Sequence, residues 1–403
     1  MSNARVVRGT WAGRAIVILA SLIVVSAAPA HADTVRSRQW YLDAMHAEEM
    51  WEKSTGVGVT VAVIDTGVDA SLPDLQGQVL EGKNFSGQSG DARTDAEGHG
   101  SKMAALIAGT GKRGSGAGTY GLAPGVRILP VRVRQKGNAL EGTRSMVDAL
   151  HYAADSDAKI INISLGGPSD DLEEKAIAYA LSKGKMIFAA AGNSGDKGNA
   201  VEYPAAYPGV IGVAGLDQEG AAASWSQHGP QVDLSAPGAA MVAACSGGTE
   251  LCRGNGTSDA SALAAASAAL IWSAHPDWTA NQVTRVLINT AGGTGTAEKR
   301  NDYVGYGAVR PRIALKDPGD PGPADVNPLP GPSASPAPGD ASSKALATSL
   351  PQQESADAAS NDGGSPAKWI ALGAGAAVLV GAAVATPVLL ARRRSGPRGG
   401  SAG

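Results

Sequence analysis

Three short segments flanked by glycine carry an acid, an imidazole and a hydroxyl. Asp65 precedes a Thr-Gly pair, His99 stands between two glycines, and Ser258 follows a Gly-Thr pair. A serine hydroxyl is a poor nucleophile at neutral pH, so a histidine must take its proton during attack and later give it to the leaving group. A carboxylate beside that histidine fixes its tautomer and stabilises the imidazolium. These residue types predict a hydrolase with Ser258 as nucleophile, His99 as base and Asp65 as orienting acid.

Structural roles for the same residues compete with this interpretation. Asp65 after an apolar run and Ser258 before an alanine-rich segment are both suited to cap a helix N-terminus, and a lone histidine is more often structural than catalytic. The order Asp, His, Ser along the chain is that of subtilisin. The three segments together resemble those of the subtilisin-like (S8) serine proteases over roughly residues 38–312. The resemblance implies a serine endopeptidase that hydrolyses peptide bonds through an acyl-enzyme.

Two further segments take on family roles within this resemblance. Asn193 falls on the family's oxyanion-hole asparagine, whose amide donates to the negative oxygen of the tetrahedral intermediate. Ser164, Leu165 and Gly166 fall on the strand that pairs with an extended substrate and lines the pocket for the residue before the cut. Such pairing gives affinity through main-chain hydrogen bonds and specificity through side-chain pockets. The resemblance therefore implies polypeptide substrates.

Two departures from the family pattern bear on the activity. Ala262 stands where the family usually has a proline, and Asp259 stands beside the nucleophile where the family usually has an apolar residue. A carboxylate at that position either disfavours an anionic oxyanion or points to solvent at a helix N-terminus, where negative charge is favourable. An alternative function stays open, that of a weakly active or inactive subtilisin-like protein with a structural role in a secretion membrane complex.

Apolar runs alternate with helical segments between these motifs. Val- and Ile-rich runs predict strands at 59–64, 126–133, 159–163, 186–191 and 210–214. Helices are predicted at 101–108, 143–154, 171–183, 258–274 and 280–290. Strands of this kind alternating with helices indicate an α/β fold with a parallel sheet and helices on both faces, as in subtilisin-like proteins. Function gathers at the carboxyl ends of such strands, and Asp65 and Asn193 both follow predicted strands.

The beginning of the chain predicts export. Arginines and then an apolar run precede a small-x-small pattern that ends at Ala32. This pattern is typical of a secretory signal peptide at residues 1–32, with an uncleaved anchor as the alternative. The stretch between the predicted cleavage site and residue 57 is short, so no large activation domain is expected. Its apolar residues Trp40 and Trp51 predict an amphipathic helix packed on the domain.

The other end of the chain predicts a membrane anchor. Residues 368–391 are predicted to form one transmembrane helix, with a buried soluble helix as the alternative, because the segment is long, apolar and uncharged from residue 369. The arginine-rich residues 392–403 are then a cytoplasmic tail. Residues 317–367, rich in Pro, Gly, Ala and Ser, predict a disordered tether. The catalytic domain, residues 33–316 with its short N-terminal extension, is expected outside the cell membrane.

Cysteines, charge and glycine patterns exclude several other functions. Cys245 and Cys252, the only cysteines, favour a disulfide over free thiols in an exported protein. No metal or other cofactor is expected, although calcium, which many relatives bind, stays open without a clear ligand cluster. A net charge of −3 without a basic stripe gives no support for nucleic-acid binding. The G-x-G-x-x-G pattern at 109–114 follows a predicted helix and not a strand, which predicts a surface loop instead of a nucleotide site.

The order of these parts carries a narrower resemblance. A signal peptide, a catalytic domain with a two-cysteine loop, a proline-rich tether, a single span and a basic tail are similar to those of the mycosins. Mycosins are membrane-anchored subtilisin-like proteases associated with type VII secretion. The resemblance implies membrane components of that machinery as partners. It leaves two roles open, cleavage of particular clients and stabilisation of the membrane complex.

Overall fold

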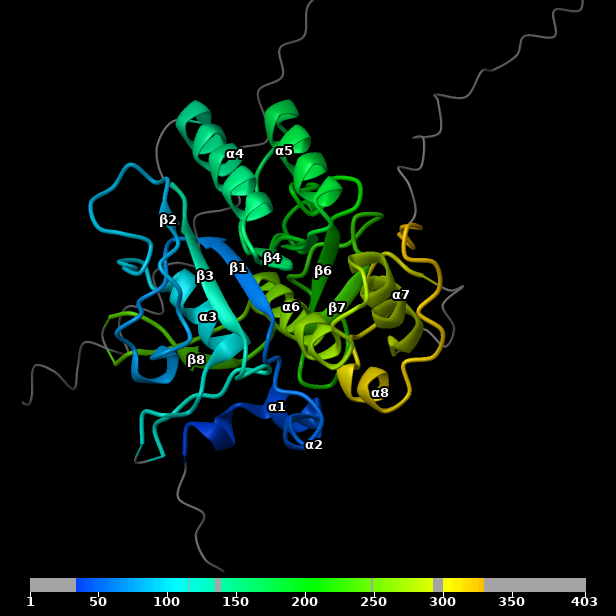
Figure 1. Ribbon diagram of the computed structural model, residues 1–403, viewed down its shortest axis with the longest axis horizontal. Helices are drawn as coiled ribbons and strands as arrows, with labels where there is room; N and C mark the ends of the chain where they lie inside the picture. Colours follow the sequence, from blue (N-terminus) through cyan, green and yellow to red (C-terminus); the bar gives the residue numbers. More distant parts are fainter. Residues whose placement is uncertain (1–33, 115, 135–138, 248, 293–299, 330–403) are drawn as a thin grey trace, which may run out of the picture. The chain divides into compact units, whose positions relative to one another are not determined.

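The computed structural model describes residues 34–329, except 115, 135–138, 248 and 293–299 (Figure 1). The predicted signal peptide, transmembrane helix and basic tail lie outside the described residues, as does the predicted tether from residue 330 onwards. The disorder predicted for residues 317–329 is wrong, because Arg285 donates to the Pro321 and Val326 carbonyls at 2.7 and 2.8 Å and holds this stretch on the domain. Within the described part, no helix combines the length and apolar character that a membrane span requires. These residues fold around one parallel sheet.

Seven strands of the described chain form this sheet in the order β2-β3-β1-β4-β5-β6-β7, and all neighbours are parallel. Their bounds are β1 (Thr60–Asp65), β2 (Lys83–Asn84), β3 (Arg127–Arg132), β4 (Ile160–Ile163), β5 (Met186–Ala190), β6 (Ile211–Leu216) and β7 (Leu234–Pro237). The five strands that the sequence predicts are confirmed as β1, β3, β4, β5 and β6. The sequence does not predict the edge strands, since β2 has two polar residues and β7 ends in proline.

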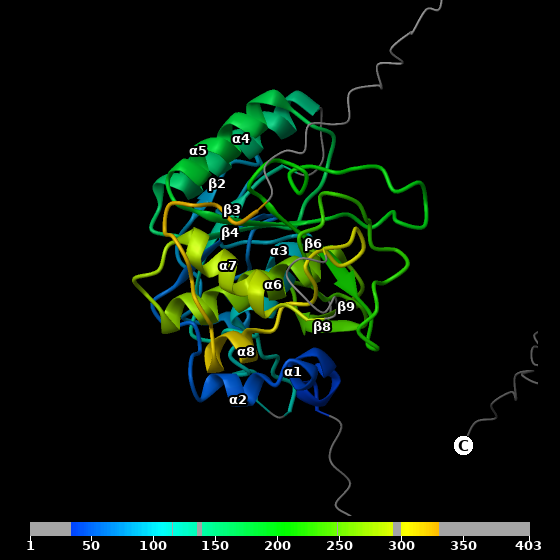
Figure 2. The same cartoon turned by 90° about the vertical axis from the view of Figure 1, so that its right-hand side faces the viewer.

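Helices cover both faces of the sheet (Figures 1 and 2). The longer helices are α3 (His99–Ala108), α4 (Ala139–Asp155), α5 (Asp171–Ser182), α6 (Thr257–Ala274) and α7 (Ala280–Thr290). The shorter ones are η1 (Arg36–Arg38), α1 (Trp40–Ala44), α2 (Ala47–Trp51), η2 (Pro73–Leu75) and α8 (Pro311–Lys316). All five predicted helices are present, and the α/β architecture that the sequence predicts is confirmed.

Successive residues of each strand supply opposite faces of the core. In β1, Val61 and Val63 pack in the cluster that contains α3 and α6, whereas Ala62 and Ile64 pack in the cluster that contains α4 and α5. Figure 2 shows α4 and α5 on one side of the sheet and α6 and α7 on the other. Because neighbouring side chains of a strand point to opposite faces, a sheet covered on both faces requires apolar residues at nearly every position.

Helix α6 lies in the centre of one face. Its residues from 259 to 272 are all buried, and most of them are alanine or another small residue. Small side chains let the helix approach the strands closely, and a helix that is apolar on all sides is typical of such a buried position. The first turn of α6, which carries Ser258, is therefore fixed to the sheet.

The segment before β1 differs from the single helix that the sequence predicts. It forms the two short helices α1 and α2, with His46 between them at a φ of 57°. A left-handed residue interrupts the helical hydrogen-bond ladder, so one continuous helix is excluded. The segment does pack on the domain, since Trp40 Nε1 donates to the Ala239 carbonyl at 3.0 Å and Trp51 Nε1 to the Leu122 carbonyl at 2.8 Å.

A disulfide-linked hairpin packs beside α3. The sequence does not predict the antiparallel strands β8 (Met241–Ala244) and β9 (Leu251–Gly254). Cys245 directly follows β8, and Cys252 lies within β9. The predicted Cys245–Cys252 disulfide is confirmed. Its neighbour Ser246 has its Oγ 3.1 Å from Ser101 Oγ, in the first turn of α3. The glycine pattern at 109–114 follows α3 and opens no helix.

Candidate active site

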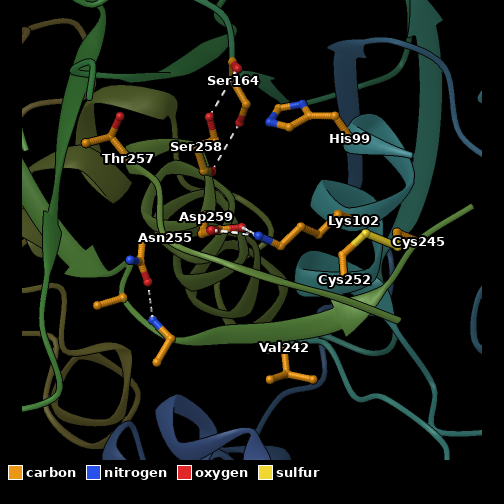
Figure 3. A network of polar contacts seen from close by, with 12 residues as sticks. His99, Lys102, Ser164, Val242, Cys245, Cys252, Asn255, Thr257, Ser258 and Asp259 are labelled. Carbon is orange, nitrogen blue, oxygen red and sulfur yellow. Dashed lines mark hydrogen bonds and ion pairs between the residues drawn. A yellow bond between two sulfur atoms is a disulfide. The ribbon is translucent and has the colours of Figure 1, made fainter. Parts of the chain in front are cut away.

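The carboxyl ends of parallel strands meet at one edge of the sheet, and the predicted site residues come to that edge. Asp65 ends β1, Ser164 directly follows β4, and Asn193 comes three residues after β5. His99 begins α3, and Ser258 is the second residue of α6. Figure 3 shows His99, Ser164 and Ser258 close together, each from a different element.

Asp65 and His99 form a direct contact. The Asp65 side chain is fully buried, and its Oδ1 accepts the Thr66 backbone N–H at 2.8 Å and lies 2.7 Å from His99 Nδ1. A carboxylate at Nδ1 holds the imidazole proton there, which leaves Nε2 as an acceptor. The negative charge of Asp65 raises the pKa of His99 and outweighs burial, which lowers it. The His99 side chain is 35% exposed, so a substrate can reach it.

The start of α3 lies so close to β1 that only glycine fits after the histidine. A methyl group on Gly100 would stand 2.1 Å from the Gly67 carbonyl oxygen and 3.1 Å from Asp65 Cβ. Thr66 Oγ1 accepts the Gly100 backbone N–H at 2.9 Å. The glycine of this motif therefore allows the acid and the imidazole to approach each other.

Buried polar groups hold Ser258 against the end of β4. Its Oγ donates to the Ser164 carbonyl at 3.2 Å, and Ser164 Oγ donates to the Ser258 carbonyl at 3.1 Å. Asn162 donates to Ser164 Oγ at 3.0 Å and accepts from Ser261 Oγ at 2.8 Å. Ser258 is thus positioned from both β4 and α6. The imidazole of His99 faces it in Figure 3.

Thr257, the residue before Ser258, orients the Asn193 side chain. Asn193 Oδ1 accepts the Thr257 backbone N–H at 2.8 Å and Thr257 Oγ1 at 3.1 Å. A backbone N–H can only donate, so the amide oxygen must face it and the amide NH₂ group must face the other way. Asn193 is exposed. The side chain therefore presents its two donors at the surface beside Ser258.

Asp259 forms a buried ion pair with a lysine of α3. Its two carboxylate oxygens lie 2.7 and 2.8 Å from Lys102 Nζ, and only 2% of the Asp259 side chain is exposed. The solvent-facing orientation considered from the sequence is therefore wrong. Burial raises the pKa of Asp259, and the Lys102 ammonium lowers it. Lys102 offsets the negative charge beside Ser258, so Asp259 brings no uncompensated anion next to that hydroxyl (Figure 3).

The segment after Ser164 borders a cavity of about 410 Å³. Leu165 and Gly166 line it together with Met146 and Glu173. Burial, followed by the nearby Asp170 charge, raises the pKa of Glu173 to about 7. A side chain of an extended peptide lying along this segment has space to enter the cavity.

Several positioning residues are missing from the sequence prediction. Thr257 lies in the segment of Ser258, and Asn162 lies in β4 just before Ser164. A polar side chain within or next to an apolar strand or helix is a signal in the sequence that could have identified both. Lys102 is harder to find, since only its place in an otherwise apolar helix marks it. Among the described residues, no group of three or more His, Cys, Asp and Glu side chains is arranged to hold a metal ion.

Known proteins are similar to this chain in sequence and in fold. The Subtilase family, Peptidase S8, matches residues 56–307. The thermophilic serine proteinase of Bacillus sp. (strain AK1) is 37% identical over 268 residues, which are 66% of this chain and 65% of the relative. The structure of MycP3 protease from the type VII (ESX-3) secretion system is 32% identical, with a TM-score of 0.59 over 68% of this chain and 87% of that chain. MycP1 from Mycobacterium smegmatis is 29% identical, with a TM-score of 0.61 over 71% and 86%. The chain therefore belongs to the subtilase family of serine peptidases.

Proposed function

We propose that this chain is a serine endopeptidase in which Asp65, His99 and Ser258 hydrolyse peptide bonds through an acyl-enzyme. The observation that carries the proposal is the 2.7 Å contact between Asp65 Oδ1 and His99 Nδ1, with the imidazole facing Ser258. Membership of the subtilase family supports the same reaction.

Acylation follows from this geometry. Ser258 Oγ turns from the Ser164 carbonyl towards His99, gives its proton to Nε2 and adds to the substrate carbonyl carbon. Asp65 stabilises the imidazolium. The carbonyl oxygen becomes an oxyanion, which accepts from the Asn193 NH₂ group at the N-terminal end of α6, where the helix dipole favours negative charge. His99 then protonates the leaving amine, and the acyl group stays on Ser258.

Water completes the reaction by the reverse route. His99 takes a proton from a water molecule, whose oxygen adds to the acyl carbon, and then returns the proton to Ser258 Oγ as the acid product leaves. The substrate lies along Ser164, Leu165 and Gly166 as an added extended strand. Main-chain hydrogen bonds of this kind bind many sequences, and the side-chain pockets select among them.

The proposed setting is the outer side of a cell membrane. Residues 1–32 direct export, residues 330–367 tether the domain, and residues 368–391 anchor it with the C-terminus in the cytoplasm. A structural relative is described as a protease from a type VII secretion system. Type VII clients are therefore the proposed polypeptide substrates, and membrane components of that machinery the proposed partners.

Cleavage of a peptide library by the purified full chain tests the endopeptidase. We expect hydrolysis by the native chain and by Ser182→Ala, a serine on the exposed side of α5, and nearly none by Ser258→Ala or His99→Ala. The double variant should lose little more than either single variant, because the members of such a unit act together. No hydrolysis by the native chain, or equal hydrolysis by Ser258→Ala, would overturn the proposal.

A second candidate is an assembly role that needs no cleavage. A relative of this fold, MycP1, is described as an essential component of the type VII (ESX-1) secretion system. A deletion strain of the source organism that regains secretion with Ser258→Ala would support this role. If only the native chain restores secretion, the assembly role fails and cleavage is the requirement.

The membrane anchor is tested by extraction. We expect the full chain to stay with membranes washed at alkaline pH, and a chain that ends at residue 367 to be released. Release of both chains would exclude residues 368–391 as the anchor.

A further inference from the structure

Glu202, in the loop between β5 and β6, lies against two glycines of the site. A methyl group built on Gly166 would stand 2.1 Å from Glu202 Oε2, and one built on Gly192 would stand 3.0 Å from Glu202 Cδ. The carboxylate therefore occupies the space beside Gly166, and it lies behind the Gln227 amide in the space beside Gly192. Gly167 and Tyr203 exchange two backbone hydrogen bonds of 2.9 Å, which fix the chain next to Glu202 relative to the substrate segment.

These two glycines border the place of the substrate residue before the scissile bond. Gly166 comes two residues after Ser164, whose carbonyl accepts from Ser258 Oγ, and the other glycine directly precedes Asn193. Consider a substrate whose scissile carbonyl carbon lies at Ser258 and whose carbonyl oxygen lies at the Asn193 amide. The side chain of the residue that carries this carbonyl then lies between the segment at Gly166 and the segment at Gly192. The side chain that enters there meets the Glu202 carboxylate.

The Glu202 carboxylate lacks a protein donor. Within the described residues, no hydrogen bond or ion pair reaches it, and burial alone raises its pKa. A partly buried carboxylate without a donor costs free energy. A charge-assisted hydrogen bond from a cationic group removes that cost and is stronger than a neutral one. Lysine and arginine are the substrate side chains that carry such a group at the end of a long stem.

We propose that Glu202 binds the cationic side chain before the scissile bond, so that this chain cleaves polypeptides after Lys or Arg. This inference rests on the proposed endopeptidase function and names its substrate class. Glu202 is then the residue that determines specificity, while Asp65, His99, Ser258 and Asn193 carry the chemistry common to all substrates.

Peptides that differ only in the residue before the cut test the proposal on the full chain. We expect kcat/KM for Lys and Arg peptides to exceed that for the matching Leu peptide. In Glu202→Gln the ratio of kcat/KM for the Lys peptide to that for the Leu peptide should fall by about 100-fold, mainly through KM, because the charge pair with the substrate is lost. The control Glu52→Gln, which removes an exposed carboxylate after α2, should keep the native ratio.

An experiment on the native chain alone keeps the proposal falsifiable even if Glu202→Gln fails to fold. Peptide chloromethyl ketones ending in Arg should inactivate the chain faster than those ending in Leu. Faster inactivation by the Leu reagent, or an unchanged Lys to Leu ratio in a folded Glu202→Gln, would overturn the role of Glu202 while the endopeptidase stands. If no peptide is cleaved and no reagent inactivates the chain, the proposed function fails and the inference falls with it.

Discussion

At the scale of single residues, we expect the charge of Asp65 to set the pH dependence of the proposed reaction. His99 must be neutral to accept the Ser258 proton, and the Asp65 carboxylate raises its pKa above the ordinary value of 6.5. We therefore expect kcat/KM to fall as the pH drops through that raised pKa.

Asp65→Asn removes the charge and keeps the shape of the side chain. The pKa of His99 should then drop, so the acid limb of the kcat/KM profile should move to lower pH. The value of kcat should fall by about 10⁴, because an asparagine permits the wrong imidazole tautomer. Profiles of the native and variant chains check both effects. Coincident acid limbs would show that Asp65 does not control the His99 pKa.

Asn193→Ala should lower kcat by about 10²–10³ with little change in KM, because the amide donors act on the oxyanion and not on the ground state. This range is the loss of kcat found when one oxyanion-hole donor is removed from subtilisin, a relative of this chain. The control Asn281→Ala removes an amide that belongs to α7 and donates to the Ala324 carbonyl at 3.0 Å. Equal kcat values for Asn193→Ala and the native chain would exclude the proposed oxyanion donor.

Residue types and spacing predict roles for Asp65, His99 and Ser258, because each lies in a short segment that contains glycine, whereas the role predicted for Asn193 comes from the family resemblance. Glu202 is not predictable in this way. Its significance comes from Gly166, far away in the sequence, and only the folded chain shows that the two meet.

At the scale of elements, the ion pair between Lys102 and Asp259 joins α3, which carries the proposed base His99, to α6, which carries the proposed nucleophile Ser258. Lys102 lies one turn after His99 on α3, and Asp259 directly follows Ser258 on α6. Both side chains are largely buried, with 11% and 2% exposed. The pair therefore constrains the two helices against each other, at the cost of removing two charges from water.

A double-mutant cycle measures this coupling. Lys102→Met or Asp259→Leu alone should lower the free energy of unfolding by about 3–5 kcal/mol, because each leaves one buried charge without its partner. The double variant should recover most of the loss. Urea unfolding of the four full-length chains gives the comparison. Additive losses in the double variant would mean that the two residues stabilise the chain independently.

Long apolar patterns made the sheet and the major helices predictable. The strands β1, β3, β4, β5 and β6 are rich in Val, Ile and Ala, so their pattern is strong without tertiary information. The β8–β9 hairpin depends on the disulfide and on packing beside α3, neither of which a local pattern carries. The break at His46 between α1 and α2 depends on one backbone angle, which the apolar spacing of the segment cannot indicate.

At the scale of the whole molecule, Asp233 connects the stability of the fold to pH. Its carboxylate is buried at the start of β7, where Oδ2 accepts the Gly212 backbone N–H at 3.1 Å. Burial raises its pKa from 3.8 to about 7. The folded chain thus binds more protons than the unfolded chain between these values, so the free energy of unfolding should fall as the pH rises from 3.8 through about 7.

Asp233→Asn removes the titrating group. We expect this variant to be more stable than the native chain by about 1–3 kcal/mol above the raised pKa, with a smaller difference at acid pH. Urea unfolding above the raised pKa and at acid pH checks this. The control is Asp277→Asn, which changes an exposed carboxylate. A native chain whose stability does not decline across this pH window would contradict the assignment.

The proposed reaction requires Asp65, His99 and Ser258 to act as one unit. The most direct test is the rate at which a fluorophosphonate labels the full chain, with the labelled residue identified by mass spectrometry. The native chain should be labelled at Ser258, and His99→Ala should react at least about 10³-fold more slowly at the same residue. Labelling at another serine, or equal rates in both chains, would contradict a nucleophile activated by His99.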